Sequence, residues 1–254
     1  METLVIHIAF FYKEKRLEYI HRIIDESHKY PFSNIDIFIH TNQHFTTENV
    51  VTVYDNVTVS VIVHTLEHPF ALTWLCRDIM FRQRETYHAF MYIEDDILVP
   101  KEAVDYWKEL SPLLKKFNYN LGFVRIETKE GTEYITDLAH GRVFSDFVVI
   151  DDTHRCALNN INPYCAFWIY SKEDFHDFIS SQYYDVNNIY DYGLRERCAI
   201  GLHGLGMNFY HGTLLPLRNN GLDPRCRIYH LPNNYAIDAD SPFAKIRFND
   251  CCLK

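Results

Sequence analysis

The amino-terminal half of the chain alternates apolar strand-like runs with helix-like segments, and this alternation restricts the possible folds more than any other feature. Residues 4–11 form a continuous apolar run, as expected of a strand buried on both faces. Residues 14–28 follow with isoleucines at helical spacing. Further strands are predicted over 35–40, 57–64, 89–93 and 121–126, and further helices over 71–85 and 101–117. This order predicts an α/β fold with a mostly parallel sheet flanked by helices.

The pattern changes after residue 126. Strand-like runs over 143–150 and 166–170 are separated by polar turns, and helices are predicted over 172–180 and 193–201. The tail, 212–254, is rich in proline and shows little periodicity. We therefore predict one domain over 1–254, in which the irregular, mixed half 127–254 folds back over the sheet of 1–126.

Charge and motif content exclude several classes of function. The formal net charge is -9 and no segment is densely basic, which argues against a nucleic-acid partner. Neither the glycine-rich dinucleotide fingerprint nor the P-loop pattern is present, so dinucleotide oxidoreductases and P-loop enzymes are disfavoured.

Apolar runs and cysteines bear on the compartment. No stretch approaches the roughly 20 apolar residues of a transmembrane helix, and the apolar start of the chain is interrupted too early by charges to be a signal peptide. The 7 cysteines are odd in number and contain no CxxC pair, which is typical of reduced thiols. We therefore expect a cytoplasmic protein with no transmembrane segment.

The run most informative about chemistry lies at 89–100. There an apolar strand ends in Glu94, Asp95 and Asp96, and a helix begins after Pro100. Ligands of open α/β sheets bind beyond the carboxyl ends of the strands. Adjacent carboxylates repel one another unless a cation joins them, and Mg²⁺ or Mn²⁺ prefers carboxylate oxygen. The alternative is a solvated turn that caps the next helix.

This run resembles the metal-binding motif of GT-A-fold glycosyltransferases, in the Glu-Asp-Asp form of N-acetylglucosaminyltransferase-like families. The segments 68–77 and 228–236 are similar to further parts of such sequences. The resemblance implies a GT-A-type nucleotide-binding sheet over 1–126 and an acceptor-side region over 127–254. The chain departs from those enzymes in showing no membrane anchor or disulfide pattern.

The resemblance also implies roles for individual residues. Asp96 would bind Mn²⁺ or Mg²⁺ directly, and Glu94 and Asp95 would lie near the ribose and sugar of the donor. Many GT-A enzymes use a late histidine as a further metal ligand, and His230 is the candidate here. A satisfied histidine on an irregular loop is the alternative role for His230.

Other donor contacts are predicted from position. Trp74 and Arg77 lie three residues apart on one helical face, where an arginine fork suits a diphosphate. The alternative is a buried tryptophan with Arg77 at its edge. Tyr12 and Arg16 follow the first strand and Asn42 follows the second, where nucleotide-binding folds place base and phosphate contacts, although ordinary loop polarity explains them equally well.

An inverting transfer needs a general base for the acceptor hydroxyl. Asp191 and Glu196 flank the start of the helix predicted after Gly193. We favour Glu196, because Arg195 and Arg197 could orient it, and keep Asp191 as the second candidate. An ordinary solvated Arg/Glu pair is the alternative.

Together these residues predict a metal-dependent glycosyltransferase, which moves a sugar from a UDP- or GDP-sugar to a glycan or glycoconjugate hydroxyl. A sugar-nucleotide pyrophosphorylase is a second possibility, but those enzymes carry a glycine-rich signature after the first strand that is missing here. A non-catalytic carbohydrate-binding domain is the third.

Overall fold

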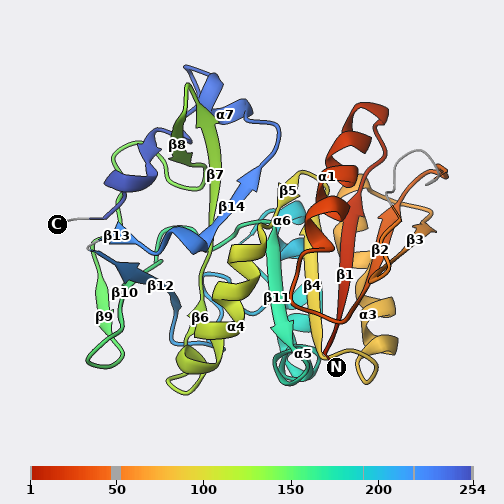
Figure 1. Cartoon of the computed structure of the whole chain (residues 1–254), viewed down its shortest axis with the longest axis horizontal. Coiled ribbons are helices and arrows are strands. Elements are labelled where there is room, and N and C mark those ends of the chain that lie inside the picture. The colour runs from red at the N-terminus through yellow and green to blue at the C-terminus, as the bar shows by residue number, and fades with distance from the viewer. Residues whose placement is uncertain (1, 47–52, 191, 220, 253–254) are drawn as a thin grey trace. The chain divides into compact units, whose positions relative to one another are not determined.

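The computed structural model describes residues 2–46, 53–190, 192–219 and 221–252. The chain divides into two compact units, each built from two separate segments (Figure 1). The first unit is Met1–Ile97 with Ala166–Leu202, and the second is Leu98–Cys165 with His203–Lys254. These units do not coincide with the predicted halves 1–126 and 127–254, since the chain leaves the first unit earlier and later returns to it.

The first unit contains a five-stranded sheet in the order β11-β4-β1-β2-β3. Its strands are β1 (Thr3–Phe10), β2 (Asn34–Thr41), β3 (Val57–Val63), β4 (Ala89–Glu94) and β11 (Phe167–Ser171). The first four strands are mutually parallel, while β11 pairs with β4 in the antiparallel sense. The predicted mixed α/β class and its parallel sheet are therefore observed.

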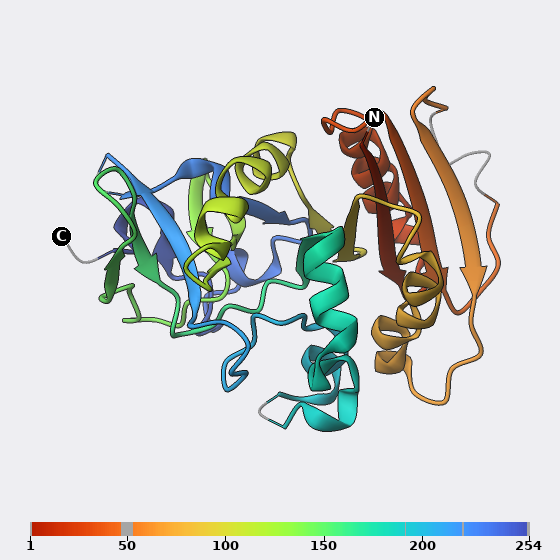
Figure 2. The ribbon, with the colours of Figure 1, turned by 90° about the horizontal axis from the view of Figure 1, so that it is seen from below.

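Burial explains why β1 and β4 lie inside this sheet. Every residue of β4 and all of β1 after Thr3 are buried, as the uninterrupted apolar runs predict. The helices of the unit are α1 (Leu17–Ser27), α2 (Leu72–Leu75), α3 (Arg77–Gln83), α5 (Lys172–Ser180) and α6 (Leu194–Ala199). Figure 2 shows α1 and α3 lying along the strands.

Helix boundaries in this unit follow local chemistry. A capping box of Ser171 and Asp174 starts α5, which satisfies the first backbone N–H groups of the helix. The helix predicted over 71–85 is instead a 3-10 turn (Pro69–Ala71) followed by α2 and α3, which meet at Cys76.

Three histidines form a hydrogen-bonded row across this sheet. His7 on β1 and His40 on β2 are fully buried, and His64 follows β3. His7 Nδ1 lies 2.8 Å from His40 Nε2, and His40 Nδ1 lies 2.9 Å from His64 Nε2. Gln83 Oε1 lies 3.0 Å from His7 Nε2 and accepts its hydrogen bond, which fixes His7 and His40 as neutral Nε2–H tautomers and makes His64 Nε2 the donor to His40.

The second unit holds two sheets. One has the order β13-β12-β10-β9 with β6 beside β12, and the other has the order β15-β8-β7-β14-β5. The strands of the first are β6 (Asn120–Leu121), β9 (Phe147–Val149), β10 (Arg155–Leu158), β12 (Thr213–Arg218) and β13 (Gly221–Leu222). Those of the second are β5 (Ile97–Leu98), at which the chain passes from the first unit into the second, β7 (Val124–Lys129), β8 (Thr132–Ile135), β14 (Arg227–His230) and β15 (Ile246–Arg247). The longest helix of this unit is α4 (Lys101–Lys115).

Several predicted elements differ from those observed. The run 121–126 is divided between β6 and β7 and belongs to the second unit rather than to the parallel sheet. The strand expected over 143–150 is confined to β9. The tail, predicted to be irregular, supplies β12 to β15, because short strands of two to six residues carry too few positions to show a period.

Two further properties concern the whole of the described chain. None of its helices combines the length and the apolar character required to cross a membrane. All seven cysteines lie in the described ranges and none of them forms a disulfide there, and all except Cys252 are buried.

Candidate functional site

Glu94, Asp95 and Asp96, here called the acidic cluster, lie at the carboxyl end of β4. Glu94 is the last residue of the strand and stands opposite Ala9 of β1, and the Asp95 N–H donates to the Ala9 carbonyl at 3.1 Å. The three acids are only 4%, 5% and 3% exposed. Three carboxylates are therefore held out of water at the edge of a parallel sheet where α/β proteins bind ligands.

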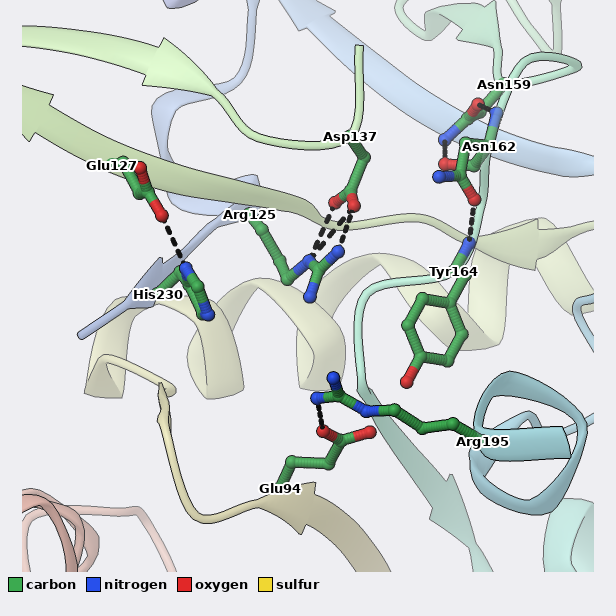
Figure 3. A network of polar contacts seen from close by, with 9 residues as sticks. All are labelled: Glu94, Arg125, Glu127, Asp137, Asn159, Asn162, Tyr164, Arg195 and His230. Carbon is green, nitrogen blue, oxygen red and sulfur yellow. Dashed lines mark hydrogen bonds and ion pairs between the residues drawn. The ribbon is translucent and has the colours of Figure 1, made fainter. Parts of the chain in front are cut away.

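Two arginines provide the positive charge around the acidic cluster. Arg16, just before α1, places Nη1 2.9 Å from both Asp95 oxygens and 3.4 Å from Asp96 Oδ2. Arg195 of α6 forms an ion pair with Glu94 (Figure 3). The side chains of Arg16 and Arg195 are 27% and 42% exposed, so both reach the buried acids from the solvent side.

The electrostatics of the acidic cluster reflect burial and the mutual repulsion of neighbouring carboxylates. Burial and the neighbouring charge of Asp96 raise the pKa of Asp95, and Arg16 offsets this only in part. Burial opposes the charged form of Arg16, but the two aspartates outweigh it and raise the pKa of the guanidinium. Repulsion among adjacent buried carboxylates would favour a cation bound at this edge of the sheet.

The predicted donor contacts Tyr12 and Asn42 are brought together. The Tyr12 backbone N–H donates to Asn42 Oδ1 at 2.8 Å, which ties the ends of β1 and β2 to each other. The Tyr12 ring is half-buried beside Phe10 and Phe45. Of the residues predicted after these strands, Arg16 is the one that reaches the acidic cluster.

The structure favours the packing role for Arg77 and Trp74. The Arg77 guanidinium is buried and lies 3.7 Å from the centre of the Trp74 ring. It donates to four backbone carbonyls, of Tyr183, Tyr184, Cys198 and Ile200. Its N–H groups are thus occupied within the core, and burial lowers the pKa of Arg77 to about 10.

Of the two candidate bases, only Glu196 can be described, since Asp191 lies outside the described residues. Glu196 is half-buried in the first turn of α6, and its carboxylate folds back over Gly193, where an added Cβ would meet Oε2 at 2.7 Å. Arg195, which was expected to orient Glu196, is paired with Glu94. A long side chain on a short helix reaches another element as readily as its sequence neighbour.

His230 ends β14 in the second unit and is 7% exposed. Its Nδ1 lies 2.5 Å from Oε1 of the fully buried Glu127, whose other oxygen accepts the Ala236 N–H at 2.5 Å (Figure 3). With both Glu127 oxygens engaged as acceptors, His230 Nδ1 carries the proton of this contact. A carboxylate behind a histidine is the arrangement that orients histidine ligands in metal sites.

The fit of a metal ion depends on the kind of site considered. The described ranges contain no group of three or more His, Cys, Asp or Glu side chains arranged to hold an ion. A Mg²⁺ ion that binds together with a nucleotide takes one or two protein carboxylates as ligands and completes its coordination with phosphate oxygens and water. The carboxylate oxygens of the acidic cluster fit this shared coordination and not a closed protein cage.

The sequence did not predict the partners of Glu94 and of His230. Arg195 was considered only as a neighbour of Glu196, and its pairing with Glu94 joins residues about a hundred positions apart. Glu127 had a weak signal, since an acid directly follows the apolar run 121–126 just as Glu94 follows 89–93. Its histidine partner comes from the tail, where no strand was expected.

No protein-family model and no curated protein sequence matches the chain. Among solved structures it is similar to TarS of S. aureus. The crystal structure of TarS 1-349 is 11% identical, with 90% of this chain and 60% of that chain covered and a TM-score of 0.42. A second crystal structure of TarS is 13% identical, with 90% and 36% covered and a TM-score of 0.44. The chain spans less than two thirds of either TarS chain.

Proposed function

We propose that this protein is a glycosyltransferase that moves a sugar from a UDP- or GDP-sugar to a hydroxyl group of a glycan or glycoconjugate. The observation that carries the proposal is the acidic cluster, three adjacent buried carboxylates at the carboxyl end of β4 with Arg16 and Arg195 beside them. Adjacent carboxylates repel a diphosphate, and a cation bound between the two would join them. This arrangement supports Asp96 as a ligand of Mn²⁺ or Mg²⁺, with His230 as a candidate second ligand.

The bound ion would supply Lewis-acid stabilisation of the charge that develops on the departing nucleoside diphosphate. The remaining work falls to side chains. Glu94 and Asp95 would hold ribose and sugar hydroxyls as hydrogen-bond acceptors. Arg16 and Arg195, which approach from the solvent side, would donate to phosphate oxygens, the geometry for which a guanidinium fork is suited.

Glu196 would act as the general base, with Asp191 as the second candidate. As the acceptor hydroxyl attacks the anomeric carbon, its proton passes to the Glu196 carboxylate. The bond from the anomeric carbon to the diphosphate breaks, and the electron pair leaves with the diphosphate oxygen. Direct displacement of this kind inverts the anomeric centre.

The test is release of nucleoside diphosphate from a panel of UDP- and GDP-sugars in the presence of Mn²⁺. Asp96→Ala should abolish release, whereas Asp78→Ala, which removes an exposed aspartate of the same unit, should not. Glu196→Gln should lower turnover by about 10²–10⁴-fold with donor affinity unchanged, and Glu18→Gln on the exposed side of α1 is its control. Full turnover by Glu196→Gln would transfer the role to Asp191, and full release by Asp96→Ala would reject the metal site.

A further inference from the structure

A cavity of about 670 Å³ lies within the second unit. Its volume falls in the range of roughly 300–1,000 Å³ typical of small-molecule sites. The cavity combines planar polar side chains with an aromatic ring, and none of its lining belongs to the acidic cluster. The residues that matter are Asp137, Arg142, Asn160, Asn162 and Phe243.

The wall of the cavity formed by 139–145 is held rigidly. The ring of Phe144 is buried, and its backbone N–H donates to the Cys251 carbonyl at 2.7 Å. Ala139 forms a β-bridge with Phe243, and the His140 N–H donates to the Pro242 carbonyl at 3.0 Å. Gly141, at φ 76°, makes the tight turn that directs Arg142. The cavity is therefore preformed, which lowers the entropic cost of binding.

Two polar groups of the cavity have fixed orientations (Figure 3). Asp137 is 7% exposed, and both of its oxygens lie 3.0 Å from Arg125 Nε, which neutralises the carboxylate and fixes its plane. Asn162 Oδ1 accepts the Tyr164 N–H at 3.2 Å, so its amide N–H₂ points the other way. The cavity thus offers an oriented acceptor pair and an oriented donor pair.

Phe243 and Arg142 complete the lining. The Phe243 ring is 39% exposed and is held edge-on by Tyr235, with centroids 6.0 Å apart at 72°. Arg142 is exposed, and its guanidinium forms no ion pair with any carboxylate of the described ranges. An apolar ring face and a planar donor fork therefore stand beside the oriented groups.

We propose that this cavity is a saccharide-binding site. Neighbouring hydroxyl groups of a sugar match planar carboxylate, amide and guanidinium partners, which bind two adjacent groups at once. The C–H face of a pyranose ring matches an exposed aromatic ring. Saccharide binding at this cavity does not depend on the proposed function. Only the identification of the bound sugar as the acceptor of the transfer rests on that function.

The lining argues against a nucleotide or free phosphate as the occupant. Phosphate sites use several backbone N–H groups at a helix start or a cluster of cations. Here one exposed arginine and one carboxylate share the lining, and no helix of the second unit begins within 137–145 or 160–162. A polyhydroxylated ligand uses donors and acceptors in equal measure, as this cavity supplies them.

Saturation-transfer NMR of the full chain with methyl glycosides of hexoses, N-acetylhexosamines and hexuronic acids tests the proposal. For a glycoside that binds, Phe243→Ala should weaken affinity about three- to tenfold through loss of ring stacking. Asn162→Asp should weaken it comparably, because it keeps the acceptor for Tyr164 but removes the donor. Phe117→Ala is the matched control, since Phe117 is a 46% exposed phenylalanine of the same unit outside the cavity.

The outcomes separate this proposal from the proposed function. Asp96→Ala should bind the glycoside like wild type, because the acidic cluster is not part of the cavity. Glycoside binding that depends on Phe243 and Asn162, with no transfer from any donor, would sustain the cavity and reject the transferase. Absence of saturation transfer from every glycoside, or equal affinity in all variants, would overturn the saccharide site even if donor hydrolysis is observed.

Discussion

The histidine row of the first unit makes stability depend on pH in a way that one substitution can reveal. Burial lowers the pKa of His7 to about 3 and, with the neighbouring imidazoles, that of His40 to about 2. An unfolded histidine titrates near pH 6.5. Below that pH the unfolded chain binds protons that the folded chain cannot accept. The free energy of unfolding should therefore fall as the pH drops through about 6.5.

The size of this loss of stability does not depend on the exact pKa values of the histidines in the folded protein. Between about pH 7.5 and about pH 5.5 a histidine that stays neutral when folded costs about 1.4 kcal/mol of stability. This holds for any folded pKa well below the window, as for both His7 and His40. The two together should therefore cost about 2.7 kcal/mol, a sizeable part of a typical domain stability of about 5–15 kcal/mol.

The variant His40→Gln isolates one of these contributions. Glutamine keeps an amide donor for His7 but cannot titrate, so the variant should lose about 1.4 kcal/mol less than wild type over the same window. Urea unfolding at a series of pH values measures this difference, and titrating groups shared by both proteins cancel from it. His44→Gln, which replaces an exposed histidine of the same unit, should run parallel to wild type. Parallel curves for wild type and His40→Gln would refute the buried neutral row.

Three further predictions test other parts of the structure. Arg77→Leu should destabilise the protein by about 3–5 kcal/mol, since four carbonyls lose their donor; normal urea unfolding with weakened donor binding would instead restore its predicted phosphate role. Arg195→Ala should raise the donor Kd, measured by calorimetry, about tenfold, and Arg195→Lys should recover part of the lost affinity. An unchanged Kd would argue against a donor contact of Arg195 beside its pairing with Glu94. Gly201→Ala should destabilise by about 1–3 kcal/mol, because its Cβ would lie 2.1 Å from the Tyr170 hydroxyl oxygen; Tyr170→Phe should relieve part of this in a double-mutant cycle of thermal unfolding, and simple additivity would contradict the contact.

The parallel sheet of the first unit could be predicted because each strand is a long, buried run. The segment 4–11 corresponds to β1 and 89–93 to β4, with boundaries within two residues. Burial on both faces demands uninterrupted apolar residues, which leaves a clear signal in the sequence. The position of the acidic cluster at a strand end followed from the same signal.

The division into units could not be predicted from local pattern. β11 returns to pair with β4 after a long excursion of the chain, and such a pairing is determined by tertiary contacts and not by periodicity. The strands of the tail are short, and β12 to β15 were missed for that reason.

Within the site, residue types were predicted better than their partners. The acidic cluster and Arg16 meet, whereas Arg77 is occupied by core carbonyls and Arg195 pairs with Glu94. An arginine side chain is long enough to contact any of several neighbouring elements, so the partner of its guanidinium group depends on how those elements pack. The cavity beside Asp137 had no sequence signal, because its lining comes from three separate segments.

The most direct test of the central claim is a thermal-shift panel of UDP- and GDP-sugars, each with and without Mn²⁺, on wild type and Asp96→Ala. A donor present at about 100 times its dissociation constant should add roughly 2.7 kcal/mol to the stability of the folded protein. The glycosyltransferase proposal predicts a Mn²⁺-dependent shift with one class of nucleotide sugar that disappears in Asp96→Ala. If wild type folds normally and shifts with no nucleotide sugar, or if Asp96→Ala shifts equally, the donor site at the acidic cluster is contradicted.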